Sequence, residues 1–386
     1  MKNFHKGIRR FCTVLLGLVF FAAGVLKLMD PVGARLVVDE YFKFFHTGWM
    51  EFASQPVAVG MALLEALTGA ALLAGVWRKW VALLTSVLTL GFTFLTLILL
   101  IFNPEMDCGC FGEIVHLSHL QTFLKNILLC LLCAGAFLPV REFSVTRTSK
   151  IVAFGIAAVS VLAFTVYSLR TLPLVDFTEF APGVSLVSDE EMTAPEEQEY
   201  QVIYEKDGEE KAFTLSDLPD STWTFVRVDQ PGGSPAASEG SAPLLYISDL
   251  TGEYYNEILT QGKVMILSIY DSDRFKRLDE AEAFLEDAAE AGFNAFALSR
   301  EYIPGFDSFI SDFKKVVTLN RSNGGVTYID NGEIIRKWPA RALPDSAELS
   351  ETAASNPLDL MVRRNSHGRI AFEGFLIYSL AILLIL

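Results

Sequence analysis

The sequence predicts a polytopic α-helical membrane protein that carries an α/β domain outside the bilayer. Three observations support this fold class. Apolar residues make up 51% of the 386 positions, which is high for a soluble protein. The two parts of the chain also differ in net charge. The first 170 residues contain 14 Lys and Arg and 9 Asp and Glu, whereas the remainder contains 17 Lys and Arg and 37 Asp and Glu. Those first 170 residues also contain five apolar stretches long enough to cross the roughly 30 Å hydrocarbon layer.

The apolar stretches define the membrane part. They lie at residues 11–29, 57–77, 80–102, 120–140 and 151–169. The first has the basic start and small residues of a cleaved signal peptide, but the four spans that follow favour a retained helix. We therefore expect a four-helix transmembrane bundle in residues 1–140 and a fifth helix in 141–170. A sixth helix is predicted at 370–386, where the apolar run is only just long enough to cross.

The orientation follows from the basic residues beside the spans, because Lys and Arg collect on the cytoplasmic side. Three segments are basic and should be cytoplasmic; they contain Lys2, Lys6, Arg9, Arg10, Arg78, Lys79, Arg141, Arg147 and Lys150. The loops between them, and everything after residue 170, should then be periplasmic, with the spans in the inner membrane of a bacterium. Arg363, Arg364 and Arg369 precede the last apolar run on the outer side and contradict this pattern, but three segments outweigh one.

The outer part begins with an acidic linker and a β-hairpin in residues 171–243. The hairpin is predicted to turn at Asp207-Gly208, and a Gly-, Ser- and Pro-rich loop follows it. From 244 to 345 the pattern predicts a mixed sheet flanked by helices. Its expected elements are a helix at 252–262, a strand at 263–270, a helix at 277–292, a strand at 293–299, a helix at 305–313, a strand at 316–319 and a hairpin at 325–338 that turns at Asn331-Gly332. Residues 346–369 are expected to be a linker.

This order of elements resembles a thioredoxin-like domain. The family's Cys-x-x-Cys would follow the strand at 263–270, where this chain has "DSDR", and its cis-proline would lie at Gly324 or Gly325. The chain has no cysteine after Cys133. We therefore expect a redox-silent domain that binds a polypeptide or positions a partner.

Two cysteines, Cys108 and Cys110, lie one glycine apart in the outer loop after the third span. Their α-carbons can approach to about 5.5–6.8 Å, which permits a disulfide, and Gly109 relieves the strain of so small a ring. A strained, exposed disulfide is a relatively oxidising one and suits transfer to a substrate. A structural disulfide or two idle thiols are the alternatives.

Other residues in the membrane part admit both chemical and structural explanations. Cys108, Cys110, His116 and His119 would suit zinc or copper(I) if they converged, although Cys-x-Cys is tighter than the usual spacing. Cys130 and Cys133 form a Cys-x-x-Cys deep in the fourth span. They would either pack between helices or relay electrons to a quinone, a cofactor that no motif supports.

Glu65 lies near the middle of the second span, where an unpaired carboxylate is costly. It should therefore be paired, protonated or facing a cavity. Lys27 and Lys125 are the candidate partners, and a hydrogen bond to Thr68 is the alternative.

The first four spans resemble the DoxX and methylamine utilisation MauE families over roughly residues 7–140. The resemblance rests on "GLVFFAAGVLKLMDP", "LLEALTGAALLAGVW" and "DCGCFG". "LPLVDFTEFAPG" after a fifth span, followed by a cysteine-free thioredoxin-like domain, resembles an architecture of Bacteroidetes relatives. The resemblance implies a role in disulfide or cofactor maturation outside the membrane, and a layout similar to that of vitamin K epoxide reductase.

The function predicted from these observations is thiol-disulfide exchange or maturation of periplasmic client proteins, with Cys108 and Cys110 as the reacting groups. The alternatives are a non-enzymatic membrane scaffold whose outer domain recruits a partner, and metal handling. The lipid bilayer is the expected environment, and the acidic outer domain argues against nucleic-acid binding.

Overall fold

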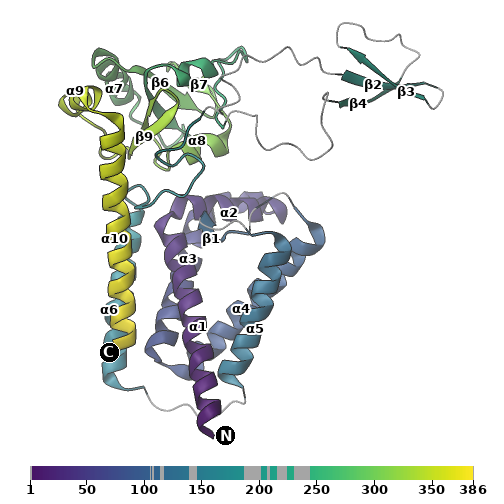
Figure 1. The fold of residues 1–386 in the computed structure, drawn as a ribbon, viewed down its shortest axis with the longest axis vertical. Coiled ribbons are helices and arrows are strands. Elements are labelled where there is room, and N and C mark those ends of the chain that lie inside the picture. The colour runs from purple at the N-terminus through teal and green to yellow at the C-terminus, as the bar shows by residue number, and fades with distance from the viewer. Residues whose placement is uncertain are drawn as a thin grey trace.

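The chain folds into a helical bundle with an α/β domain at one end and a separate three-stranded sheet (Figure 1). In this computed structural model the structure describes residues 2–104, 106, 108–113, 117–138, 146–186, 201–206, 209–214, 224–229 and 244–385.

The bundle contains the five predicted spans. Five described helices are long and apolar enough to cross a membrane: Lys6–Met29, Gly48–Ala74, Arg78–Phe102, His119–Phe137 and Thr148–Ser168. They belong to α1 (Lys2–Met29), α3 (Ser54–Ala74, preceded by the 3-10 helix η1, Gly48–Ala53), α4 (Arg78–Phe102), α5 (His119–Phe137) and α6 (Thr148–Ser168). The five-span prediction is confirmed, and these helices indicate a lipid bilayer environment.

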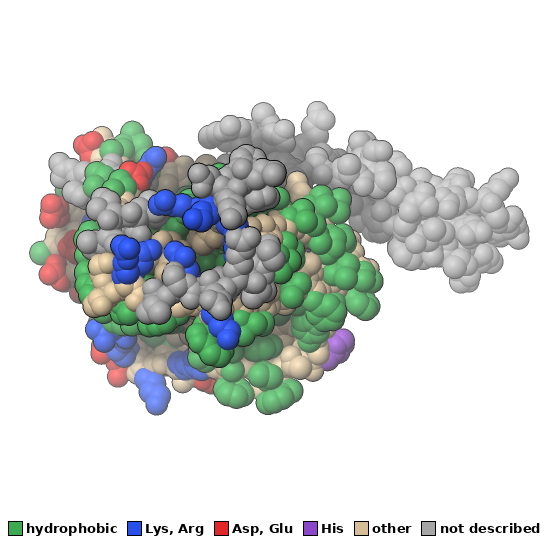
Figure 2. Space-filling model, turned by 90° about the horizontal axis from the view of Figure 1, so that it is seen from below, with side chains coloured by type: hydrophobic (Ala, Val, Ile, Leu, Met, Phe, Trp, Pro, Cys, Tyr) green, Lys and Arg blue, Asp and Glu red, His purple; other side chains and the backbone are tan. Residues whose placement is uncertain are grey.

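The basic segments lie together at one end of the bundle. α1, α4 and α6 all begin there, and Arg9, Arg78 and Lys150 lie in their first turns or close to them. Figure 2 views this end directly and shows Lys and Arg side chains gathered on it. The α/β domain and the Cys-Gly-Cys loop lie at the opposite end (Figure 1).

Small residues let α1 and α3 pack closely. A Cβ atom on Gly24 would collide with the backbone nitrogen of Ala66, and one on Gly69 would collide with the backbone nitrogen of Phe21. Small residues at such positions let the backbones of membrane helices approach each other. The α1–α3 contact therefore depends on two glycines that tolerate no side chain.

The outer segment between α1 and α3 is a helix, not the loop that we expected. α2 (Pro31–Phe44) lies across the outer end of the bundle (Figure 1). Asp30 caps it by accepting a hydrogen bond from the Gly33 amide, and Pro31 occupies the first turn, where a missing N–H costs nothing.

The α/β domain contains the predicted mixed sheet. Its strand order is β7-β6-β5-β8-β9, with β5, β6 and β7 parallel and β8 and β9 antiparallel to their neighbours. The strands are β5 (Lys263–Ile269), β6 (Asn294–Ser299), β7 (Phe309–Ile310), β8 (Gly325–Asp330) and β9 (Glu333–Trp338). Successive residues of β5 enter opposite cores, Val264 and Ile266 on one face and Met265 and Leu267 on the other, as the two-residue period of a strand requires.

Helix α7 (Leu278–Glu290), strands β5 and β6 and the final hairpin confirm the prediction, but three elements were predicted wrongly. The expected helix at 305–313 contains strand β7, and the expected strand at 316–319 lies in α8 (Phe313–Leu319). Asp312 starts α8 by accepting hydrogen bonds from the Lys314 and Lys315 amides. The β-branched residues after it are buried in a helix because packing outweighs their strand preference. The expected helix at 252–262 is reduced to a short 3-10 helix, η2 (Asn256–Thr260).

The expected linker at 346–369 is helical. It contains α9 (Ser346–Ala354), capped by Asp345, and the first part of α10 (Pro357–Ile385). α10 runs beside α6, with the rings of Phe164 and Phe375 stacked 4.5 Å apart (Figure 1). It is not among the five helices found apolar enough to cross, so the sixth span stays a prediction.

The hairpin of the acidic region is confirmed by β2 (Gln201–Lys206) and β3 (Glu209–Thr214), which pair antiparallel. Its turn residues, Asp207 and Gly208, lie outside the described residues. A further strand, β4 (Thr224–Asp229), pairs with β2 and was not predicted.

The segment after α6 is fixed to the sheet. Gly183 donates its amide hydrogen to Ile334 O, and the ammonium of Lys337 on β9 lies 2.7 Å from Asp176 Oδ2. Burial acts to raise the pKa of Asp176, but the Lys337 charge and the hydrogen bonds from Lys337 and Thr178 outweigh it and lower that pKa. The buried ion pair therefore holds the exit of α6 against the α/β domain.

The glycine packing of α1 against α3 can be tested by adding one methyl group. Gly24→Ala should lower the stability of the bundle by about 1–3 kcal/mol, because the new Cβ is forced against backbone atoms. Gly60→Ala is the matched control, since a Cβ there meets open space. Thermal unfolding of the detergent-solubilised full chain measures both variants. Equal melting temperatures would contradict the close α1–α3 contact.

Candidate functional site

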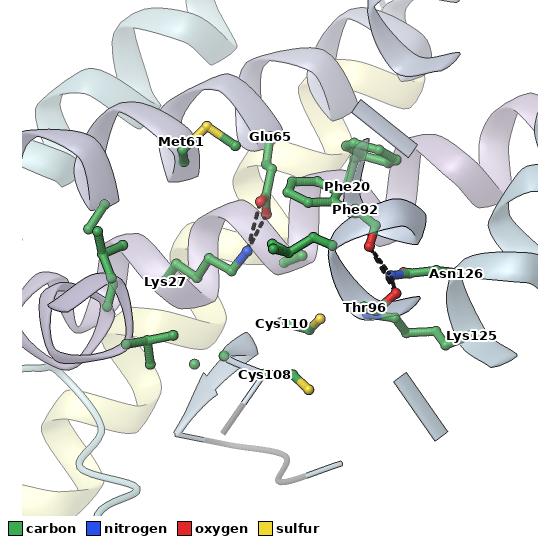
Figure 3. Close-up of a pocket in the computed structure, with 18 of the residues that line it drawn as sticks. Phe20, Lys27, Met61, Glu65, Phe92, Thr96, Cys108, Cys110, Lys125 and Asn126 are labelled. Atoms are coloured by element: carbon green, nitrogen blue, oxygen red, sulfur yellow. Dashed lines mark hydrogen bonds and ion pairs between the residues drawn. The ribbon is translucent and has the colours of Figure 1, made fainter. Parts of the chain in front are cut away.

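A cavity of about 190 Å³ lies under α2 at the outer end of the bundle. Side chains from α1, α2, α3, α4 and α5 line it, together with the Cys-Gly-Cys loop (Figure 3). Most of its wall is apolar. Five of the residues singled out from the sequence converge here: the cavity is lined in part by Lys27, Glu65, Cys108, Cys110 and Lys125.

The Cys-Gly-Cys loop packs directly on α2. Gly109 has a φ of 60°, which favours glycine, and a Cβ there would come within 2.5 Å of Val37 Cγ1. The Tyr41 hydroxyl donates a hydrogen bond to Cys108 O at 3.3 Å. Burial raises the pKa of Tyr41, so this hydroxyl keeps its proton and remains a donor. Strand β1 (Cys110–Glu113) continues the loop.

The two loop cysteines have different surroundings. The structure has both as thiols and not as a disulfide. Cys108 is buried and its Sγ lies 3.3 Å from His119 Nδ1, whereas Cys110 is half-buried. His119 Nε2 lies 2.9 Å from Pro104 O. A carbonyl oxygen only accepts hydrogen bonds, so Nε2 carries the hydrogen in the neutral ring and Nδ1 presents its lone pair to Cys108. The sequence suggested His119 only as a metal ligand, and its contact with Cys108 was not foreseen.

The intramembrane carboxylate is paired with the first of the two lysines proposed. Lys27 Nζ lies 2.7 Å from Glu65 Oε1 and 2.8 Å from Oε2, and the two side chains point toward each other in Figure 3. The Glu65 side chain is only 3% exposed. Lys27 also lies over the ring of Phe92, 5.8 Å from its centroid. The Thr68 alternative is not seen, because Thr68 Oγ1 has no hydrogen-bond partner among the described residues.

A second polar group on the wall comes from α5 and α4. Asn126 donates hydrogen bonds to Phe92 O at 3.2 Å and to Thr96 Oγ1 at 3.1 Å. We did not single out Asn126, Thr96 or Tyr41 from the sequence. For Asn126 a signal existed, because a polar amide inside an apolar span usually faces a partner or a cavity.

Cys130 and Cys133 do not line the cavity. Cys130 Sγ lies 3.3 Å from Thr93 Oγ1, and Cys133 Sγ lies 3.6 Å from Thr89 Oγ1, so both pack against α4. These contacts favour helix packing over a relay to a quinone.

The metal alternative has little support from the described residues. Within them, no group of three or more His, Cys, Asp or Glu side chains is placed to hold a metal ion. Cys108 and His119 approach each other, but His116 lies outside the described residues, so the proposed ligand set cannot be assembled from them.

Comparison with known families gives a match for the membrane part of the chain. Residues 6–139 match the family model of the methylamine utilisation protein MauE. This part of the chain is similar to MauE. The match spans α1 to α5 and includes the cavity, the Cys-Gly-Cys loop and His119. Residues 198–231 match a domain of unknown function, DUF8463. No curated protein and no solved structure matches the chain. The similarity to DoxX stays a prediction.

The ion pair in the MauE-like bundle can be tested by removing one partner. Lys27→Met should destabilise the bundle by about 3–5 kcal/mol, because it leaves Glu65 buried without its counter-charge. The double variant Lys27→Met/Glu65→Gln should recover much of that loss, since no buried charge is then unpaired. Thermal unfolding of the solubilised chain measures both. A double variant no more stable than Lys27→Met alone would contradict the pairing.

Proposed function

We propose that the chain is a membrane-embedded thiol-disulfide exchange protein, with Cys108 and Cys110 as the reacting pair. The observation that carries the proposal is the contact of Cys108 Sγ with the unprotonated nitrogen of His119, at the wall of a cavity that Cys110 also lines. A thiol beside a histidine nitrogen is the usual arrangement for generating a thiolate.

The proposal places this site on the periplasmic side of a bacterial inner membrane. The basic ends of α1, α4 and α6 lie at the end opposite the loop, which by the positive-inside rule would be cytoplasmic. The periplasm is an oxidising compartment in which disulfides form and persist. The loop and the α/β domain would then meet client proteins on that side.

The proposed reaction begins from a Cys108–Cys110 disulfide. A client thiolate attacks Cys110, the more exposed sulfur, and the bond between Cys108 and Cys110 breaks. Cys108 leaves as a thiolate and takes up the proton that the client thiol lost, and its S–H then donates to His119 Nδ1. A second client thiol attacks the mixed disulfide and releases Cys110 as a thiol. Two electrons and two protons pass from the client to the cysteine pair, and the reverse reaction reduces a client disulfide.

We further propose that the α/β domain is thioredoxin-like and binds the client without redox chemistry. The strand order and directions support this fold. Segment 271–274, which follows β5, carries no cysteine, and Gly324 occupies the position expected for a cis-proline. The ring of Phe275 packs against Gly324 so closely that a Cβ there would collide with it. An aromatic side chain therefore lies where the family's redox site would be.

The MauE match supports a maturation role in methylamine utilisation as the setting of this exchange. In that setting the client is a periplasmic protein that acquires disulfides. The scaffold alternative predicts instead that the loop cysteines never exchange with another protein.

Trapping of a mixed disulfide tests the proposal. In Cys108→Ser, the Cys110 thiolate can still attack a client disulfide, but no resolving thiol remains, so a mixed disulfide should accumulate in membranes. Cys110→Ser is the matched control and should trap far less. Non-reducing electrophoresis with mass spectrometry identifies the adduct. No adduct in Cys108→Ser, or equal amounts in both variants, would favour the scaffold.

The role of His119 is tested separately. His119→Gln should slow the alkylation of Cys108 at neutral pH by at least about tenfold, because the thiol loses the nitrogen that accepts its proton. Alkylation of Cys110 in the same molecules is the internal control and should change much less. A Cys108 rate equal to that of the unaltered chain would remove His119 from the mechanism.

A further inference from the structure

α2 separates two parts of the molecule and contributes to both. Its residues 32, 36 and 40 recur at helical spacing and face the α/β domain. Leu36 belongs to the apolar core of that domain, together with Phe180, Tyr270 and Val316, and Val32 packs against the same cluster. The α/β domain therefore uses one face of α2 as part of its own core.

Two ion pairs, one buried and one exposed, link the α/β domain to α2 and to its N-cap residue. Arg321 Nε lies 2.9 Å from Asp30 Oδ2, and the two side chains are only 4% and 12% exposed. The other Asp30 oxygen caps α2 through the Gly33 amide. At the far end of α2, Lys314 Nζ lies 3.0 Å from Glu40 Oε1, but Lys314 is 62% exposed, so this pair contributes little. The buried Asp30–Arg321 pair is the stronger clamp.

The opposite face of α2 holds the thiol site. Ala34, Val37, Val38 and Tyr41 line the cavity. Val37 occupies the space beside Gly109, and Tyr41 donates its hydrogen bond to Cys108 O. The Cys-Gly-Cys loop is thus packed against α2 on the side away from the domain, with no room between Val37 and Gly109 to absorb a movement of the helix.

We propose that the α/β domain regulates the thiol site through α2. While the domain is docked by the Asp30–Arg321 pair, α2 holds the loop in its buried position, and undocking of the domain loosens α2 and makes the loop thiols more reactive. The proposal depends on the exchange function proposed above and states how that site is regulated. Docking and reactivity are coupled because one rigid helix bears both contacts.

Removing the charge clamp tests this coupling. In Arg321→Met, hydrogen exchange of α2 amides should accelerate, and a membrane-impermeant maleimide should alkylate the loop cysteines about fivefold faster or more. Lys276→Gln is the control, because it removes the same charge from an exposed position of the domain. Both measurements use the full chain in membranes or detergent.

A second variant separates undocking from unfolding. Asp30→Asn keeps an oxygen for the Gly33 amide, and its NH2 group replaces the oxygen that accepts from Arg321, so both the charge and that hydrogen bond are removed. Continued protection of β5 and β8 shows that the domain is still folded. Should the domain unfold in either variant, its contact with α2 is lost as well, and the loop should still react faster.

Three results would overturn the proposal. They are unchanged exchange of α2 in both variants, faster exchange of α2 with unchanged or slower alkylation of the loop, and an equal effect of Lys276→Gln. Alkylation requires no client protein. A failure to trap a mixed disulfide would therefore reject the exchange function without affecting the measured link between domain docking and the alkylation rate of the loop.

Discussion

The pairing of Lys27 with Glu65 is the constraint on which the bundle depends. Two charges inside an apolar bundle must meet, because either one alone would be costly in a medium of low dielectric. Their meeting requires α1 and α3 to lie close together, and Gly24 and Gly69 make that approach sterically feasible. The same pair places a buried ion pair on the wall of a mostly apolar cavity.

Buried ion pairs recur where the bundle meets the α/β domain. Asp30 joins Arg321 at the start of α2, and Asp176 joins Lys337 after α6. Apolar burial between these parts is non-directional, whereas a buried charge pair accepts only one arrangement. The two pairs therefore define how the domain sits, and α2 transmits that position to the Cys-Gly-Cys loop.

The cysteines differ in the side chains that surround them. Cys108 faces Nδ1 of His119, and the contact of Nε2 with Pro104 O sets the tautomer of that ring. Nδ1 is therefore able to accept a hydrogen bond from the Cys108 thiol. Cys130 and Cys133 face threonine hydroxyls between two helices and are held as packing groups. In the function that we propose, the same residue type therefore serves exchange at Cys108 and helix packing at Cys130 and Cys133.

The sequence by itself determined the elements that depend on local chemistry. Span length and apolar content predicted five membrane helices, and Asp207-Gly208 and Asn331-Gly332 predicted two hairpins, because these signals lie within a few residues of each other. It also picked out the cavity's charged and sulfur-bearing residues, since charges and closely spaced cysteines are rare in apolar sequence. The strand predicted at 316–319 is a helix because burial outweighed the strand preference of Val316 and Val317, which lie in α8.

Only the tertiary structure decided which distant groups meet. Lys27 and Lys125 were equal candidates for Glu65 until the helices were packed, and nothing local joins Cys108 to His119 or Asp30 to Arg321. These contacts link residues that are 11 to 291 positions apart. Which residues meet is determined by the packing of whole helices and of the sheet as they exclude water and lipid. No short stretch of sequence specifies that packing.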